Sequence, residues 1–253
     1  EIKECDWSSD VCSSDLTNTP GKEFRVMTSG GFTAAYKLLI PELERLTGLT
    51  PVTVTTSIGT GDISIPNRLK RGEIADLVIC SDNVLQQFIA DGYVLQEGSA
   101  QLARSIIGIA VRAGAPKPDV GTPEALRDTL LRATSIGYSA SESGKYVTTQ
   151  LYQRLGIAEQ ALPKSRFVGN GERVASVIAR GEVEVGFQQI SELLPVQGIA
   201  HITPIPEELQ LVSTFTAGVG VNSPHPAAAR EVIRFLASSA AAEVISGTGL
   251  EPF

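Results

Sequence analysis

The chain has 253 residues, of which 42% are hydrophobic and 19% charged, and its formal net charge is -7. This length and apolar content allow one large domain or two modest ones with a substantial core. The acidic balance argues against a nucleic-acid-binding protein, which needs a basic face. No apolar run in the sequence approaches the length of a membrane-spanning helix.

The first sixteen residues have no helical or strand period. The stretch CDWSSDVCSSDL within them resembles the read-through translation of a sequencing-adaptor oligonucleotide, so we exclude residues 1–16 from the fold. They hold the only Trp and two of the three cysteines, which leaves Cys80 without a partner for an intrachain disulfide. We expect the native N-terminus to be missing and any secretion signal to be unobservable.

Three strands are predicted in the first part of the chain, each followed by a polar loop and a helix. The strands are residues 24–28, 52–56 and 75–80, and the first helix ends at Gly48. Repetition of strand, loop and helix is typical of a parallel sheet with crossover helices. The ends of such strands lie along one edge of the sheet, where ligands bind.

The rest of the chain repeats this order and then returns. Strands are predicted at residues 105–111, 135–138, 183–187 and 211–221, and helices at 122–132, 145–155, 170–180 and 226–238. We therefore expect an α/β protein with two lobes, joined by crossing strands near 105–111 and 211–221. The expected boundaries are 22–107 with 213–253 for the first lobe, and 108–212 for the second.

The loops that follow the strands carry most of the chemical signal. Each combines Ser or Thr with Gly immediately before a helix, where free backbone N–H groups and a partial positive charge attract anions. Taken singly, each Ser is an ordinary helix cap; four such loops together favour an anion site. The predicted ligand-binding residues in them are Ser29, Gly30, Gly31, Ser57, Gly59, Thr60, Ser81, Ser139, Ser141, Ser143 and Gly144.

Several sharper motifs fail. Residues 59–64 lack the third Gly of a dinucleotide fingerprint, and residues 139–146 resemble a phosphate-binding loop but have Tyr146 where Ser or Thr belongs. There is no nucleophile elbow, and the two His residues lie far apart. We therefore predict no metal and no cofactor, and we expect Cys80 to be a buried apolar residue.

Five further side chains are candidates for the site. Arg112 directly follows a crossing strand and is either a carboxylate clamp or an ordinary surface cation. Tyr138 and Tyr146 flank the second-lobe Ser loop. We expect Tyr138 to pack in the core and Tyr146 to be able to form a hydrogen bond with the ligand. Gln188 and Gln189 end a strand, where one amide is expected to reach a ligand oxygen and the other to cap the sheet.

Four stretches, RVMTSGGF, RLKRGEIADLVICSD, ARSIIGIAVRAGAPKPD and YSASESGKY, resemble the molybdate-binding branch of type II periplasmic solute-binding proteins. The resemblance runs from Phe24 to Pro252 and implies a two-lobed clamshell that holds an oxyanion with Ser hydroxyls and backbone amides. It implies Ser29 and Ser57 as first-lobe donors, and places Ser143 on the second-lobe loop. It also implies a periplasmic monomer that serves a membrane permease.

The resemblance departs in one place, because molybdate binders have a Tyr where this chain has Gln188 or Gln189. The combination of GAPKPD, YSASESGKY, ARGEVEVGFQQISEL and NSPHPAAAR looks closer to the aconitate isomerases of the same fold family. That likeness implies a polycarboxylate ligand and a proton shift between two carbons, which needs a carboxylate clamp and a proton carrier. The candidates for proton carrier are Tyr138, Lys145, Tyr146, Glu142 and Asp62.

Two other functions stay open at the level of sequence. A transport receptor for molybdate, tungstate or an organic acid needs only a closing cleft, and a ligand sensor has the same requirement. The charge of the cleft helps to distinguish the possible ligands. A tricarboxylate calls for at least one Arg or Lys in the cleft, whereas a cleft with only neutral donors favours a tetrahedral oxyanion.

Overall fold

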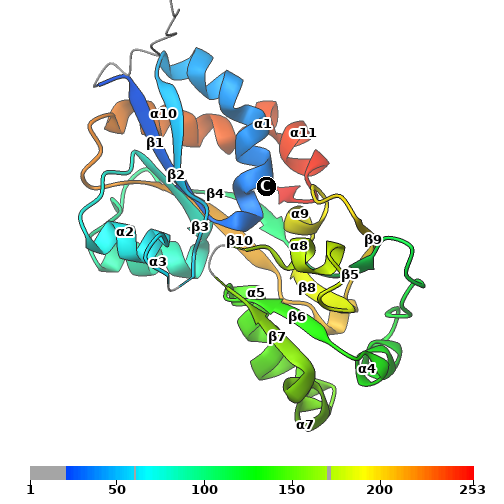
Figure 1. The fold of residues 1–253 in the computed structure, drawn as a ribbon. Coiled ribbons are helices and arrows are strands. Elements are labelled where there is room, and N and C mark those ends of the chain that lie inside the picture. Colours follow the sequence, from blue (N-terminus) through cyan, green and yellow to red (C-terminus); the bar gives the residue numbers. More distant parts are fainter. Residues whose placement is uncertain (1–20, 60, 170–171) are drawn as a thin grey trace, which may run out of the picture.

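A computed structural model describes residues 21–59, 61–169 and 172–253, and they form two sheets flanked by helices (Figure 1). The first sheet has six strands in the order β11-β4-β10-β3-β1-β2. Its strands are β1 (Glu23–Thr28), β2 (Thr50–Thr55), β3 (Leu77–Ser81), β4 (Ala100–Ser105), β10 (Ser213–Val219) and β11 (Glu251–Pro252). The second has five, in the order β7-β6-β8-β5-β9. They are β5 (Ile107–Arg112), β6 (Ile136–Ser139), β7 (Ser165–Val168), β8 (Val185–Gln189) and β9 (Ile199–Pro204).

The three predicted parallel strands are neighbours in the first sheet, with β1 between β2 and β3. The sheet as a whole is mixed, because β10 pairs antiparallel with both β3 and β4. The second sheet repeats this arrangement: β6 is parallel to β7 and β8, and β5 is antiparallel to β8 and β9. In each sheet, the strand by which the chain enters from the other lobe, β10 in the first and β5 in the second, is antiparallel to the strands on both sides of it.

Both faces of the first sheet are covered by helices because its strands are apolar on both sides. Val26 and Ile79 lie in one core, under α1 (Gly30–Thr47), α10 (Pro226–Leu236) and α11 (Ser239–Gly247). Met27 and Cys80 point to the opposite core, under α2 (Ile65–Lys70) and α3 (Asp82–Ala90). The expected burial of Cys80 is confirmed, at 0% exposure.

Helices also cover both faces of the second sheet. They are α4 (Pro123–Arg132), α5 (Glu142–Tyr146), η1 (Val147–Leu151), α6 (Tyr152–Arg154), α7 (Ala158–Ala161), η2 (Leu162–Lys164), α8 (Val174–Ala179), α9 (Ile190–Leu193) and η3 (Glu207–Leu209). The helix predicted at 145–155 runs from Glu142 to Arg154, with the π-helical turn η1 in the middle. The helix predicted at 170–180 begins only at Val174, and residues 170–171 lie outside the described residues.

The chain passes between the sheets twice. The predicted strand 105–111 is divided at Ile106, with β4 in the first sheet and β5 in the second. The predicted strand 211–221 is shorter, and the return lies between β9 and β10. Gln189 links the two crossings, because its Oε1 accepts a hydrogen bond from Ser105 (2.7 Å) and its Nε2 donates to Ser213 (3.1 Å). Within the described residues, no helix has the length and apolar character that crossing a bilayer requires.

Candidate functional site

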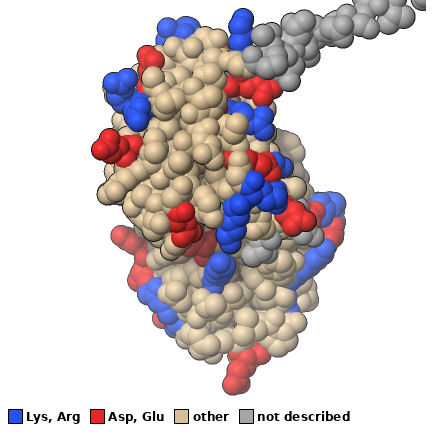
Figure 2. Space-filling view, turned by 90° about the vertical axis from the view of Figure 1, so that its left-hand side faces the viewer, with Lys and Arg blue, Asp and Glu red and all other residues tan. Residues whose placement is uncertain are grey.

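A cavity of about 450 Å³ lies between the two lobes, and residues from both line it. It sits at the carboxyl ends of β1 and β3 on one side, and of β6 and β8 on the other. This is where parallel α/β sheets place ligand sites. Figure 2 shows one side of the molecule, on which basic and acidic side chains are spread among uncharged ones.

Ser29 joins β1 to α1 and lines the cavity. Its N–H donates to the Ile79 carbonyl (2.7 Å), and its carbonyl accepts from the Thr33 hydroxyl (2.9 Å), which fixes the turn. Its Oγ is buried yet has no partner among the described residues. The first N–H groups of α1 have no acceptor within the helix. This end of α1 therefore presents several unsatisfied donors to an anion.

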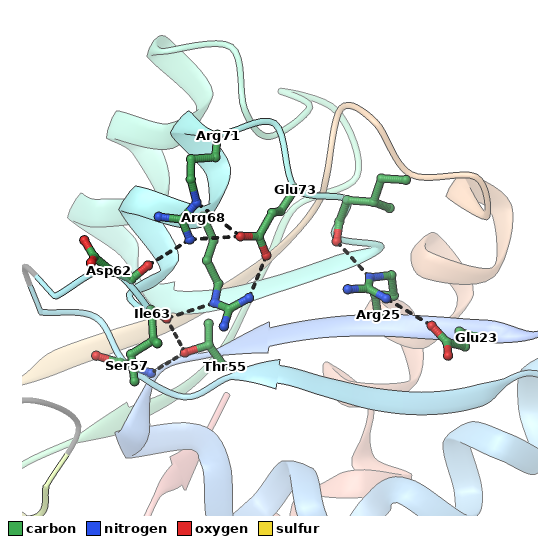
Figure 3. A network of polar contacts seen from close by, with 10 residues as sticks. Glu23, Arg25, Thr55, Ser57, Asp62, Ile63, Arg68, Arg71 and Glu73 are labelled. Carbon is green, nitrogen blue, oxygen red and sulfur yellow. Dashed lines mark hydrogen bonds and ion pairs between the residues drawn. The ribbon is translucent and has the colours of Figure 1, made fainter. Parts of the chain in front are cut away.

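The loop that carries Ser57 is held from behind by two arginines (Figure 3). Ile63 carbonyl oxygen accepts hydrogen bonds from Thr55 (2.7 Å) and from Arg68 Nε (3.1 Å). Arg71 donates to the Asp62 carbonyl (2.8 Å), and Glu73 accepts from both guanidinium groups. The loop is thus fixed by contacts on its outer side, which leaves its inner side for ligand. Predicted ligand residue Thr60 lies outside the described residues.

Three hydroxyls at the start of α5 form a chain on the second lobe. Ser139 and Ser141 are 2.6 Å apart, and Ser141 and Ser143 are 3.0 Å apart, between Oγ atoms. Three hydroxyl hydrogens serve two bonds, so one donor is left for the cavity. Gly144 allows the helix to approach this closely, because a Cβ there would lie 1.9 Å from the Ser139 carbonyl oxygen.

Most of the residues predicted for the site line one cavity. From the first lobe these are Ser29, Gly30, Gly31, Ser57, Gly59 and Ser81. From the second they are Ser139, Ser141, Glu142, Ser143, Lys145, Tyr146, Gln188 and Gln189. Gly144, Asp62, Tyr138 and Arg112 are not among the lining residues.

Arg112 and Tyr138 lie away from the cavity for clear reasons. β5 enters the second lobe beside the cleft at Ile107, so Arg112 lies at the far end of the strand, exposed and beside Gly181. This position corrects the expectation that it clamps a carboxylate. Tyr138 packs edge-on against Phe167, with ring centroids 5.7 Å apart.

The other predicted polar groups are held by the protein itself. The Tyr146 hydroxyl donates to the Leu209 carbonyl (2.5 Å) and accepts from Arg154 (2.9 Å). Gln188 Oε1 accepts the Ala175 N–H (3.1 Å). Gln189 links the two crossings in the same way. These three side chains therefore line the cleft and also form hydrogen bonds within the protein.

The sequence reasoning missed three charged residues of the cavity, Glu172, Arg173 and Glu192, of which the last two bear on its chemistry. Glu192, on the short helix α9, is 9% exposed and hydrogen-bonds the Gln188 side chain. Arg173, just before α8, is half-buried and faces the same cavity. Neither stands in a recognisable motif: Glu192 lies within α9, and Arg173 directly precedes α8.

Burial dominates the acidity of Glu192. Loss of hydration raises the pKa of this carboxyl to about 7, although the charge of Arg173 and the hydrogen bond from Gln188 act in the opposite direction. A buried carboxyl that titrates near neutrality in a cleft is a recurrent feature of functional sites.

This pKa predicts how stability depends on pH. Glu192 binds its proton more tightly when folded, with a pKa of about 7, than at the ordinary value of 4.5. The stability that this tighter proton binding gives the folded protein is therefore fully present below pH 4.5, and it is lost as the pH rises through about 7. We expect Glu192→Gln to gain stability over the wild type between about pH 5 and about pH 8, on the order of 3 kcal/mol. Urea unfolding of both proteins at both pH values measures this, and an unchanged difference would contradict it.

Two α/β lobes, between which the chain passes twice, enclose a cleft lined with hydrogen-bond donors for an anion. This arrangement is that of a solute-binding protein. The chain belongs to the bacterial extracellular solute-binding protein family, whose family model matches residues 24–251. Members of this fold include receptors for small oxyanions.

Relatives of known name agree with this assignment. An aconitate isomerase from Pseudomonas sp. is 37% identical over 238 residues, which cover 94% of this chain and 90% of the relative. The periplasmic molybdate-binding protein of Azotobacter vinelandii superposes with a TM-score of 0.72 at 15% identity, over 90% of this chain and 98% of that one. The sulfate-binding protein SubI of Mycobacterium tuberculosis gives 0.67 at 18% identity, over 91% and 87%. The last two show a shared fold.

Proposed function

We propose that this protein binds aconitate in the cleft between its lobes and interconverts the cis and trans isomers. Support comes from the relative that carries this name, with 37% identity over nearly the whole length of both chains. The reaction moves one proton from the methylene carbon to the vinyl carbon while the double bond shifts. It requires that the carboxylates be held and that charge growing on one of them be stabilised.

The presence of two cationic side chains in the cleft is the observation that carries this proposal. Lys145 and Arg173 line the cavity together with the neutral donors of Ser29, Ser57 and Ser143. A molybdate or sulfate ion is held by neutral donors alone, as the family resemblance implies, whereas a tricarboxylate needs cations for its additional charge. The Arg173 guanidinium forms no hydrogen bond or ion pair with the other described residues, so its donors remain for a ligand carboxylate.

We further propose lobe boundaries at residues 22–107 with 213–253 and at residues 108–212, a periplasmic location and a monomeric state. The second candidate function is a receptor that delivers an oxyanion or an organic acid to a membrane permease. The Ser hydroxyls at the ends of α1 and α5 favour it, since they suit a tetrahedral anion.

A paired assay tests the proposal. Protein beginning near Thr17 is incubated with trans-aconitate, and the cis isomer is followed by chromatography while thermal shifts are measured with trans-aconitate, molybdate and sulfate. We expect steady turnover and stabilisation by aconitate. Strong stabilisation by molybdate or sulfate with no turnover would contradict the proposal and leave the transport receptor.

A further inference from the structure

Glu192 is a buried residue in the wall of the cavity. It lies on α9, directly after β8, and its carboxylate packs against the first turn of α1 in the other lobe. The contact is close: a Cβ on Gly30 would lie 2.0 Å from Glu192 Oε1. Ser191, its neighbour, donates to the Gly31 carbonyl (2.7 Å) and so holds α9 against α1. The carboxylate therefore has a fixed place beside the donors that await an anion.

This buried carboxylate lacks a neutralising partner. Across residues 21–59, 61–169 and 172–253 it forms no ion pair, and Arg173 acts on it only through its charge. Gln188 is its hydrogen-bond partner, and since Gln188 Oε1 already accepts the Ala175 N–H, the amide NH₂ is the group that donates to Glu192. A buried acid held by one neutral donor destabilises the fold, so packing gives no reason for its presence.

The other carboxylates and the tyrosine of the cavity are engaged elsewhere. Glu142 accepts hydrogen bonds from Asn83 (2.7 Å) and from Ser213 (3.5 Å), and thereby bridges the two lobes. Glu172 is ion-paired with Arg180 (2.6 Å). Tyr146 uses its hydroxyl hydrogen on a carbonyl, as described above, and Lys145 is exposed at the cleft rim. Among the described lining residues, Glu192 alone combines a fixed position, burial and a free acid–base function.

We propose that Glu192 is the proton carrier of the aconitate isomerisation, an inference that rests on the proposed function. The carboxylate takes a proton from the methylene carbon, and the electron pair of that C–H bond forms the new double bond as the old one opens. The resulting carboxylic acid returns its proton to the former vinyl carbon. Glu192 ends as it began, so no other reactant is needed. Ser29 and the N–H groups of α1 stabilise the ligand carboxylate on which charge grows.

The Glu192→Gln variant tests this role because it keeps the size of the side chain and removes its ability to carry a proton. We expect turnover to fall by about 10²- to 10⁴-fold. Binding of trans-aconitate, measured by thermal shift, is expected to be at least as tight as in the wild type, since a negative charge is removed. Glu231→Gln removes an exposed carboxylate from α10 and serves as the matched control with unchanged turnover.

A pH profile separates a proton carrier from a structural residue. Wild-type kcat/KM is expected to fall as the carboxyl becomes protonated, below about pH 7, and the residual activity of Glu192→Gln to lack this limb. The other charged groups that line the cavity are unchanged in both proteins; they are Glu142, Lys145, Glu172 and Arg173. An active wild type whose Glu192→Gln variant keeps more than about a tenth of its turnover overturns the role of Glu192 alone. A wild type that binds aconitate without turnover overturns the proposed function, and this role with it.

Discussion

Gly30→Ala is expected to lower turnover of aconitate by about a hundredfold or more while the fold keeps its stability. The new Cβ would lie 2.0 Å from Glu192 Oε1 and 3.0 Å from Glu192 Cδ, so the carboxylate must move. It lies at the end of a flexible side chain beside an open cavity, so it can swing aside at little cost. Alanine is also the better residue in a helix, so the melting temperature should stay constant or rise.

The matched control for Gly30→Ala is Gly247→Ala at the end of α11. A Cβ there would meet no atom within 4 Å, so neither turnover nor fold should change. Steady-state kinetics and thermal unfolding of both variants give the comparison. Full activity in Gly30→Ala would mean that the place of the Glu192 carboxylate is irrelevant to the reaction.

Arg173→Ala is expected to weaken binding of aconitate by about 10- to 100-fold, since a charge-assisted hydrogen bond to a ligand carboxylate contributes about 1.5–3 kcal/mol. Its guanidinium lines the cavity and is not engaged by other described residues. Loss of this positive charge should also raise the pKa of Glu192, because Arg173 lowers it in the wild type. The acid limb of the kcat/KM profile should therefore move to higher pH.

Arg166→Ala is the control for Arg173→Ala. Arg166 is an arginine of the same lobe that is ion-paired with Glu182 (2.7 Å) and exposed to solvent. Calorimetric titration of both variants with trans-aconitate measures the effect. Equal affinities for the two variants would exclude Arg173 as the carboxylate clamp.

The sequence predicts the strands and helices well because their hydrophobic periods are local signals. Apolar runs such as residues 24–28 and 75–80 point to strands buried on both faces, and Gly48 ends its helix with a φ of 67°. Antiparallel insertion of β10 between β3 and β4 is a long-range pairing that no local pattern contains. The division of residues 105–111 at Ile106 is likewise set by the crossing between lobes.

The site was predictable where it follows from the strand ends and unpredictable where it depends on the way the lobes meet. Ser29, Ser57 and Ser139 are marked by loops before helices, and all three line the cavity. Glu192 carries no mark in its sequence neighbourhood, because its burial comes from the packing of α9 on α1. Arg112 was a candidate for the cleft because it follows a crossing strand. It lies at the end of β5 that is far from the cleft, since the strand enters the lobe at Ile107.

Proton exchange during turnover tests the central claim most directly. The protein is incubated with trans-aconitate in D₂O, and the cis isomer is examined by proton NMR. A proton carrier that exchanges with solvent predicts product with deuterium at the newly formed methylene carbon, and predicts that the Glu192→Gln variant forms almost none of it. If cis-aconitate does not appear, and the recovered trans isomer contains no deuterium, this chain does not move a proton on aconitate, and the cleft belongs to a receptor.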